Sequence, residues 1–109
     1  MRRIYHILPT SDWQAESDQP YQAESLKTEG LIHCSNRDQV ARVANLFYAA
    51  AGELLVLCIN ADMLGDRLRD EDPGVDESFP HVYGPIERSA VLAVTPLRRG
   101  PDGQWAFED

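Results

Sequence analysis

The stretch Gly30-Leu31-Ile32-His33-Cys34-Ser35 is the segment on which the predicted fold depends. Two apolar residues lead to a histidine, and a hydroxyl residue follows where a helix is expected to begin. We therefore predict a short buried strand over residues 31–34 that runs directly into a helix. A polar group between a strand end and a helix N-terminus is a common place for a binding site, because free backbone N–H groups lie nearby.

The residues after this stretch have helical periodicity. Ser35, with Asp38 three residues later, resembles a capping box in which Asp replaces the usual Glu. Gly52 is expected to end the helix. The sequence therefore predicts one long helix over residues 36–51. Its apolar stripe is formed by Val40, Val43, Ala44, Phe47 and Ala51.

Strand-like segments lie on both sides of this helix. Residues 2–8 alternate weakly, residues 54–59 form a continuous apolar run typical of a strand covered on both faces, and residues 87–97 alternate again. Residues 67–78 are polar and charged and are expected to form a loop, as are residues 79–85. The order predicts an α+β fold with a small mixed or antiparallel sheet, the long helix and short helical turns packed on it.

The composition narrows the possible functions. A chain of 109 residues is expected to form one domain over residues 1–109. Ten basic and eighteen acidic residues give a net charge of −8, which argues against nonspecific nucleic-acid or membrane binding. The N-terminal residues lack a signal-peptide pattern, and Cys34 and Cys58 form no disulfide or metal-binding spacing. We therefore expect a cytoplasmic protein with buried thiols; its oligomeric state is not indicated.

The three histidines are the first candidate site residues. His6, His33 and His81 each lie in or beside an apolar, strand-like stretch. For each, a structural role at a strand is the alternative to catalysis. His33 is the best placed, since the expected N-terminus of the long helix favours an anionic ligand nearby. Ser35 is predicted to be the N-cap rather than a nucleophile, with the backbone beside it contacting the ligand.

Two further segments carry candidate residues. Arg67, Arg69 and Glu71 belong to a charged cluster, which is either a solvated loop or a flap whose arginines bind phosphate and whose carboxylate acts as a base. Tyr83 and Gly84 lie in the segment Phe79-Pro80-His81-Val82-Tyr83-Gly84-Pro85. Its aromatic residues either stack on a planar ligand ring or dock into the core, and Gly84 permits a close backbone approach.

Three motifs resemble a small, mostly bacterial family, domain of unknown function 952. They are Ile4-Tyr5-His6-Ile7, the stretch quoted first, and Phe79-Pro80-His81-Val82-Tyr83-Gly84-Pro85-Ile86. Members of that family typically read IYHI, EGFIHCS and FPHLYGPL at these places. The resemblance implies a remote similarity to the ADP-ribosyltransferase-like fold, in which a split, bent β-core holds NAD in an extended cleft.

That resemblance also implies site roles. His6 matches the first signature position, which meets the ribose of the adenosine half, and His33 or Ser35 matches the second, beside the nicotinamide. The third position, often a glutamate, has no clear match; Glu71 and Glu87 are the candidates by chain order, and His81 or Tyr83 is the alternative.

Together these observations predict a cleft lined by the three histidine motifs that binds NAD or an ADP-ribose-type nucleotide, with ADP-ribosyl or glycosyl transfer or hydrolysis as the reaction. His6, His33, Glu71 and His81 are the catalytic candidates. Ser35, Arg67, Arg69, Tyr83 and Gly84 are the ligand-binding candidates. NAD enters as a substrate, and no firmly bound cofactor is predicted. A non-catalytic binding module is the first alternative, and a metal-dependent hydrolase using the histidines is the second, although no spacing supports a metal site.

Overall fold

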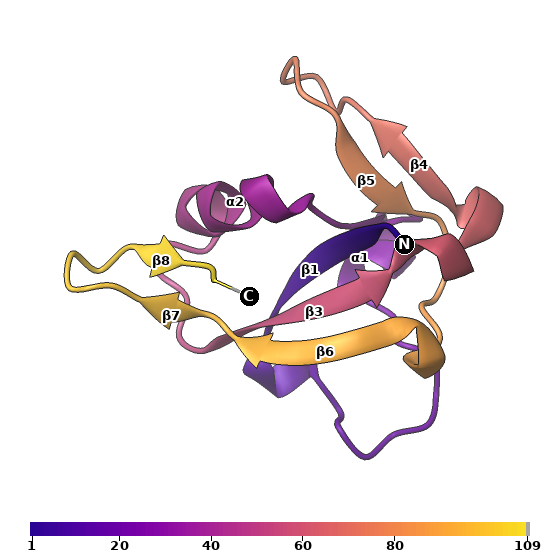
Figure 1. The fold of residues 1–109 in the computed structure, drawn as a ribbon, viewed down its shortest axis with the longest axis horizontal. Helices are drawn as coiled ribbons and strands as arrows, with labels where there is room; N and C mark the ends of the chain where they lie inside the picture. Colours follow the sequence, from indigo (N-terminus) through magenta and orange to yellow (C-terminus); the bar gives the residue numbers. More distant parts are fainter. Residues whose placement is uncertain (109) are drawn as a thin grey trace.

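The computed structural model describes residues 1–108, which form two three-stranded antiparallel sheets with short helices around them (Figure 1). The first sheet has the strand order β1-β3-β6, and the second has the order β2-β5-β4. A two-stranded ribbon, β7-β8, follows. The strands are β1 (Arg3–Pro9), β2 (Ile32–His33), β3 (Leu54–Asn60), β4 (Leu68–Glu71), β5 (Phe79–Val82), β6 (Val91–Pro96), β7 (Arg98–Arg99) and β8 (Trp105–Ala106).

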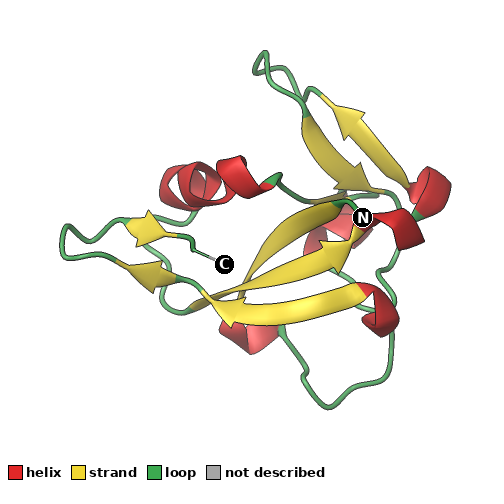
Figure 2. Cartoon of the chain, in the orientation of Figure 1, coloured by secondary structure: helices red, strands yellow, loops and turns green. Residues whose placement is uncertain are grey.

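The helices are all short and surround the two sheets (Figure 2). The two α-helices are α1 (Glu24–Thr28) and α2 (Val40–Phe47). Single turns of 3₁₀ helix are η1 (Thr10–Asp12), η2 (Arg37–Gln39), η3 (Ala61–Met63), η4 (Gly65–Arg67) and η5 (Arg88–Ala90). These elements confirm the α+β class with mostly antiparallel strands. No helix within residues 1–108 is long and apolar enough to cross a bilayer.

Both faces of the first sheet are covered by packed side chains, as the apolar run in its central strand β3 predicts. Leu57 and Ile59 of β3 belong to one hydrophobic cluster, and Leu54 and Val56 belong to the other. The strand beside it divides its side chains in the same way, with Ile4 and Leu8 of β1 in the first cluster and Tyr5 and Ile7 in the second. The continuous apolar run at residues 54–59 therefore has the physical cause inferred from the sequence.

The predicted helix over residues 36–51 is four residues too long at its C-terminal end, because α2 ends at Phe47. Backbone carbonyls in the segment after α2 accept hydrogen bonds from the C-terminal part of the chain. The Trp105 indole donates to the carbonyl of Tyr48 (2.9 Å), and the Arg99 guanidinium donates to those of Ala49 (2.8 Å) and Ala51 (2.9 Å). These long-range hydrogen bonds hold the segment after α2 against the C-terminal part of the chain, which periodicity alone does not reveal.

The predicted N-cap is also wrong. The capping box is formed by Asn36 and Gln39, whose side-chain Oε1 accepts from the Asn36 backbone N–H at 2.8 Å. Ser35 remains extended because its backbone N–H and C=O pair with Tyr5 of β1, at 2.7 and 2.9 Å. This isolated bridge joins β1 of the first sheet to the residues that follow β2 of the second.

The loop predicted over residues 67–78 and continued to residue 85 is in part a β-hairpin. Strands β4 and β5 pair antiparallel, with Arg69 opposite His81 and Glu71 opposite Phe79. The charges of β4 suggested a loop, yet charged side chains are common on edge strands, where they limit pairing with other chains. In Figure 1 this hairpin projects away from the first sheet.

Candidate functional site

His33 and His81 lie directly opposite each other on the paired strands β2 and β5. Their ring centroids are 5.5 Å apart, and the rings are nearly perpendicular, at 86°. Their neighbours Ile32 and Val82 point to the other face and are fully buried in the core. Alternation along two short strands therefore places both imidazoles on one face of the second sheet.

Both histidines line a cavity of about 620 Å³ between the second sheet, α2 and the β4–β5 connection. We call it the His33–His81 cavity. Most of its other walls are apolar or aromatic. The lining residues are Ile7, His33, Cys34, Ser35, Arg42, Val43, Leu46, Phe47, Tyr48, Pro73, Val75, Glu77, Phe79 and His81.

Each of the two histidines is oriented by a carboxylate. His33 Nε2 donates to Glu29 at 3.0 Å, and His81 Nδ1 donates to Glu71 at 3.0 Å. Because an ionised carboxylate only accepts, each neutral ring carries its proton on the bonded nitrogen. His33 Nδ1 and His81 Nε2 are then acceptors. His81 is buried and His33 is half exposed, so the pair combines a fixed ring with a solvent-accessible one.

Glu71 is the centre of a small polar group on the β4–β5 hairpin. Its Oε1 accepts from His81 and also from the Tyr83 hydroxyl. The bond from Tyr83, followed by that from His81, lowers the pKa of the Glu71 carboxyl, so it is ionised at neutral pH. The same bond raises the pKa of Tyr83. The Arg69 guanidinium lies 5.0 Å from the centre of the Tyr83 ring.

His6 does not line the cavity. It points to the side of β1 that carries Ile4 and Leu8, and both ring nitrogens have protein partners. Nδ1 donates to the backbone carbonyl of His33 at 2.7 Å, and Nε2 lies 2.8 Å from the Tyr21 hydroxyl, from which it accepts. Burial lowers the pKa of His6 to about 4. The structure thus brings together two of the three histidines, and His6 supports the backbone of the strand that carries His33.

Arg67 and Gly84 contact each other rather than the cavity. The Arg67 guanidinium donates to the Pro85 carbonyl (2.6 Å) and to that of Leu64 (3.2 Å), and it pairs with Glu87 (3.0 Å). A Cβ added at Gly84 would lie 3.1 Å from Arg67 Cδ. The close approach expected at Gly84 is therefore made by Arg67, which packs against it.

The site is completed by Ser35, which was predicted from the sequence, and by Glu29, Arg42 and Glu77, which were not. Ser35 is buried in the wall of the cavity. Glu29, which contacts His33, precedes it by four residues. This spacing predicts a contact between the two side chains only if the chain turns between them. Arg42 and Glu77 both line the cavity and form a bidentate ion pair. No local signal predicts this pair, because its members are 35 residues apart.

A metal site of three histidines does not form in the described part of the chain. Within residues 1–108, no group of three or more His, Cys, Asp or Glu side chains is arranged to hold a metal ion. His6 is directed toward Tyr21 and the His33 carbonyl, away from the pair formed by the other two rings.

Comparisons with known proteins place these features in a family. The chain is similar to CC0527 from Caulobacter crescentus, whose X-ray structure has 27% identity and a TM-score of 0.85 over 96% of this chain and 94% of that chain. The solution NMR structure of CC0527 has 29% identity and a TM-score of 0.78 over 95% and 91% of the two chains. The search among curated proteins found no match. The family model described as "Protein of unknown function (DUF952)" matches residues 7–94, so the chain belongs to the DUF952 family.

Proposed function

We propose that the chain binds NAD or a related ADP-ribose-type nucleotide in the His33–His81 cavity. The observation that carries the proposal is the pair of carboxylate-oriented histidines on one wall of a largely apolar cavity. The volume of about 620 Å³ lies within the usual range for small-molecule sites. A few fixed polar groups in an otherwise apolar hollow are what orient such a ligand.

The lining matches the parts of such a nucleotide. Phe47, Tyr48 and Phe79 offer aromatic surface for a planar ring, such as nicotinamide or adenine. The acceptor nitrogens of His33 and His81 suit the hydroxyls of a ribose. Burial of Ser35 and His81 in the same wall limits water around the sugar.

Transfer or hydrolysis at the anomeric carbon is the reaction that this arrangement favours. The bond from the anomeric carbon to the leaving base breaks, and the electron pair departs with the base. The oxygen of water or an acceptor hydroxyl forms the new bond, and its proton passes to the acceptor nitrogen of His81. Glu71 acts as a positioning residue, because it fixes the His81 ring and stabilises its protonated form.

The relationship to the ADP-ribosyltransferase-like fold is part of this proposal. Its support is a β-core divided into two three-stranded sheets, which meet at the bridge between Tyr5 and Ser35. His6 and His33 come from the first two strands in chain order, as that fold implies. We place the activity in the cytoplasm, where the free thiols of Cys34 and Cys58 stay reduced.

One observation favours a non-catalytic binding module as the second candidate. The Glu71 carboxylate already accepts from His81 and Tyr83, so it is not directed at a ligand hydroxyl as a third signature residue would be. The two candidates share the same cavity and differ in turnover alone.

Calorimetry with NAD, ADP-ribose and nicotinamide tests the proposal. We expect binding to the wild type, weakened at least about tenfold in His33→Ala and His81→Ala through loss of ligand hydrogen bonds. Arg98→Gln, on β7 outside the cavity, is the control and should bind as the wild type does. Release of free nicotinamide from NAD, lost in His81→Ala, identifies an enzyme, and binding without release identifies the module. If none of the three compounds binds at millimolar concentration, the proposal is wrong.

A further inference from the structure

A carboxylate of the protein itself is held by three N–H donors at the edge of the His33–His81 cavity. Arg42 of α2 donates from Nη1 to Glu77 Oε1 at 2.9 Å and from Nη2 to Oε2 at 2.6 Å. The amide of Gln39 donates to the same Oε2 at 2.8 Å. Arg42 and Glu77 both line the cavity, so this contact faces the space in which a ligand would lie.

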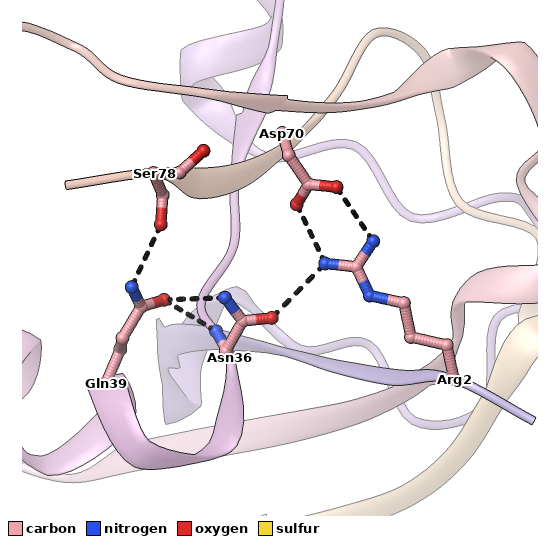
Figure 3. Close-up of polar contacts among 5 residues, drawn as sticks. All are labelled: Arg2, Asn36, Gln39, Asp70 and Ser78. Atoms are coloured by element: carbon pink, nitrogen blue, oxygen red, sulfur yellow. Dashed lines mark hydrogen bonds and ion pairs between the residues drawn. The ribbon is translucent and has the colours of Figure 1, made fainter.

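Of the two donor residues, Gln39 is held in place without help from Glu77. Gln39 is buried, and its Oε1 accepts from the Asn36 backbone N–H (2.8 Å) and side-chain amide (3.2 Å), as Figure 3 shows. Its Nε2 also donates to the Ser78 carbonyl at 3.0 Å. The β4–β5 hairpin is anchored separately by two hydrogen bonds from Arg2 to Asp70, at 2.9 and 2.7 Å. When the Glu77 side chain moves away, the Gln39 amide therefore stays in position, and the Arg42 guanidinium becomes available to another anion.

We propose that Arg42 and Gln39 form the subsite for a phosphate group of the nucleotide, and that Glu77 occupies this subsite when no ligand is bound. The proposal rests on the proposed function, since the anion belongs to the ligand of the same cavity. A phosphate presents acceptor oxygens to a guanidinium in the same bidentate manner as a carboxylate.

The electrostatics make this exchange feasible. The side chains of Arg42 and Glu77 are 49% and 33% exposed. Ion pairs at such exposed positions contribute little to stability. The hydrogen bonds from Arg42 and Gln39 lower the pKa of Glu77, so this carboxylate is charged at neutral pH and competes with an incoming anion. Removing its charge should therefore strengthen binding of a phosphate group.

Calorimetry on four variants tests the subsite, with ADP-ribose, adenosine and inorganic pyrophosphate as probes. Glu77→Gln should tighten ADP-ribose and pyrophosphate binding about three- to tenfold, and Arg42→Gln should weaken both about tenfold or more. Glu16→Gln and Arg98→Gln make the same charge changes at exposed positions outside the cavity and should stay within about twofold of the wild type. Adenosine, which lacks phosphate, should respond to none of the four. Circular dichroism confirms that each variant is folded.

The outcomes separate this proposal from the one on which it rests. If the affinity for ADP-ribose is unchanged in both Glu77→Gln and Arg42→Gln, the nucleotide proposal is supported and the phosphate subsite is overturned. If pyrophosphate binds and its affinity falls in Arg42→Gln, while ADP-ribose does not bind, the anion subsite is supported and the nucleotide proposal is overturned. If neither probe binds any variant, both proposals are overturned.

Discussion

The buried His6 makes stability depend on pH in a way that can be calculated. Its pKa is about 4 in the folded chain, against an ordinary value of 6.5, and burial is the main cause. The unfolded chain therefore binds a proton more readily than the folded chain. Stability from this residue is complete above pH 6.5 and is lost as the pH falls toward 4.

The magnitude follows from the size of the shift. Each pKa unit corresponds to about 1.36 kcal/mol, so a shift from 6.5 to about 4 amounts to roughly 3 kcal/mol of unfolding free energy. His6→Gln removes the titrating ring and keeps an amide that can both donate and accept. The wild type should lose roughly 3 kcal/mol more than the variant between pH 7.5 and 4.

Urea unfolding followed by tryptophan fluorescence measures this difference at a series of pH values. The carboxylates titrate in both proteins, so their contribution cancels when the two curves are subtracted. The slope of the difference should be steepest between pH 6 and 4.5, where His6 is protonated in the unfolded chain alone. Two parallel curves would show that His6 is not held neutral by burial, and the reasoning about its role would be refuted.

Three other features of the structure give separate predictions. Arg99→Ala should lower the free energy of unfolding by about 1–2 kcal/mol, because the carbonyls after α2 lose their donor; a loss below about 0.3 kcal/mol in urea unfolding would contradict this. Burial raises the pKa of Cys34 to about 12, so in the native protein Cys58 should react with a disulfide reagent well before Cys34, and equal rates would be inconsistent. Glu71→Ala should lower the pKa of Tyr83 toward its ordinary value, followed by the NMR shifts of its ring; an unchanged midpoint would rule out the hydrogen bond between them.

The sequence predicts the parts of the fold that depend on local pattern. The apolar run at residues 54–59 indicates a covered central strand, and β3 has that role. The stripe that begins at Val40 correctly indicates a helix, but the segment after Phe47 is held by Arg99 and Trp105, more than 45 residues further along the chain. The β4 strand was missed because charges that suit an edge strand look the same in sequence as those of a solvated loop.

The candidate site could be predicted only in part, because local pattern shows which face a side chain occupies but not which strands pair. Alternation on β2 and β5 places His33 and His81 on one face, but the pairing that puts them opposite each other is not visible in the sequence. His6 also lies in an apolar, strand-like stretch, but its side chain points to the face of β1 that carries Ile4 and Leu8, away from the cavity. Side chains alternate along a strand, so a shift of one residue would place it on the opposite face. Arg42 and Glu77 meet only because α2 and the hairpin fold against the same cavity.

Amide chemical-shift mapping by NMR, with ADP-ribose titrated into uniformly ¹⁵N-labelled protein, tests the central claim most directly. Binding in the His33–His81 cavity predicts shifts concentrated in β2, β5, α2 and the connection between β4 and β5, while β6 and β7 stay unchanged. Shifts centred on β6–β8, or no shifts with ADP-ribose at millimolar concentration, would contradict it.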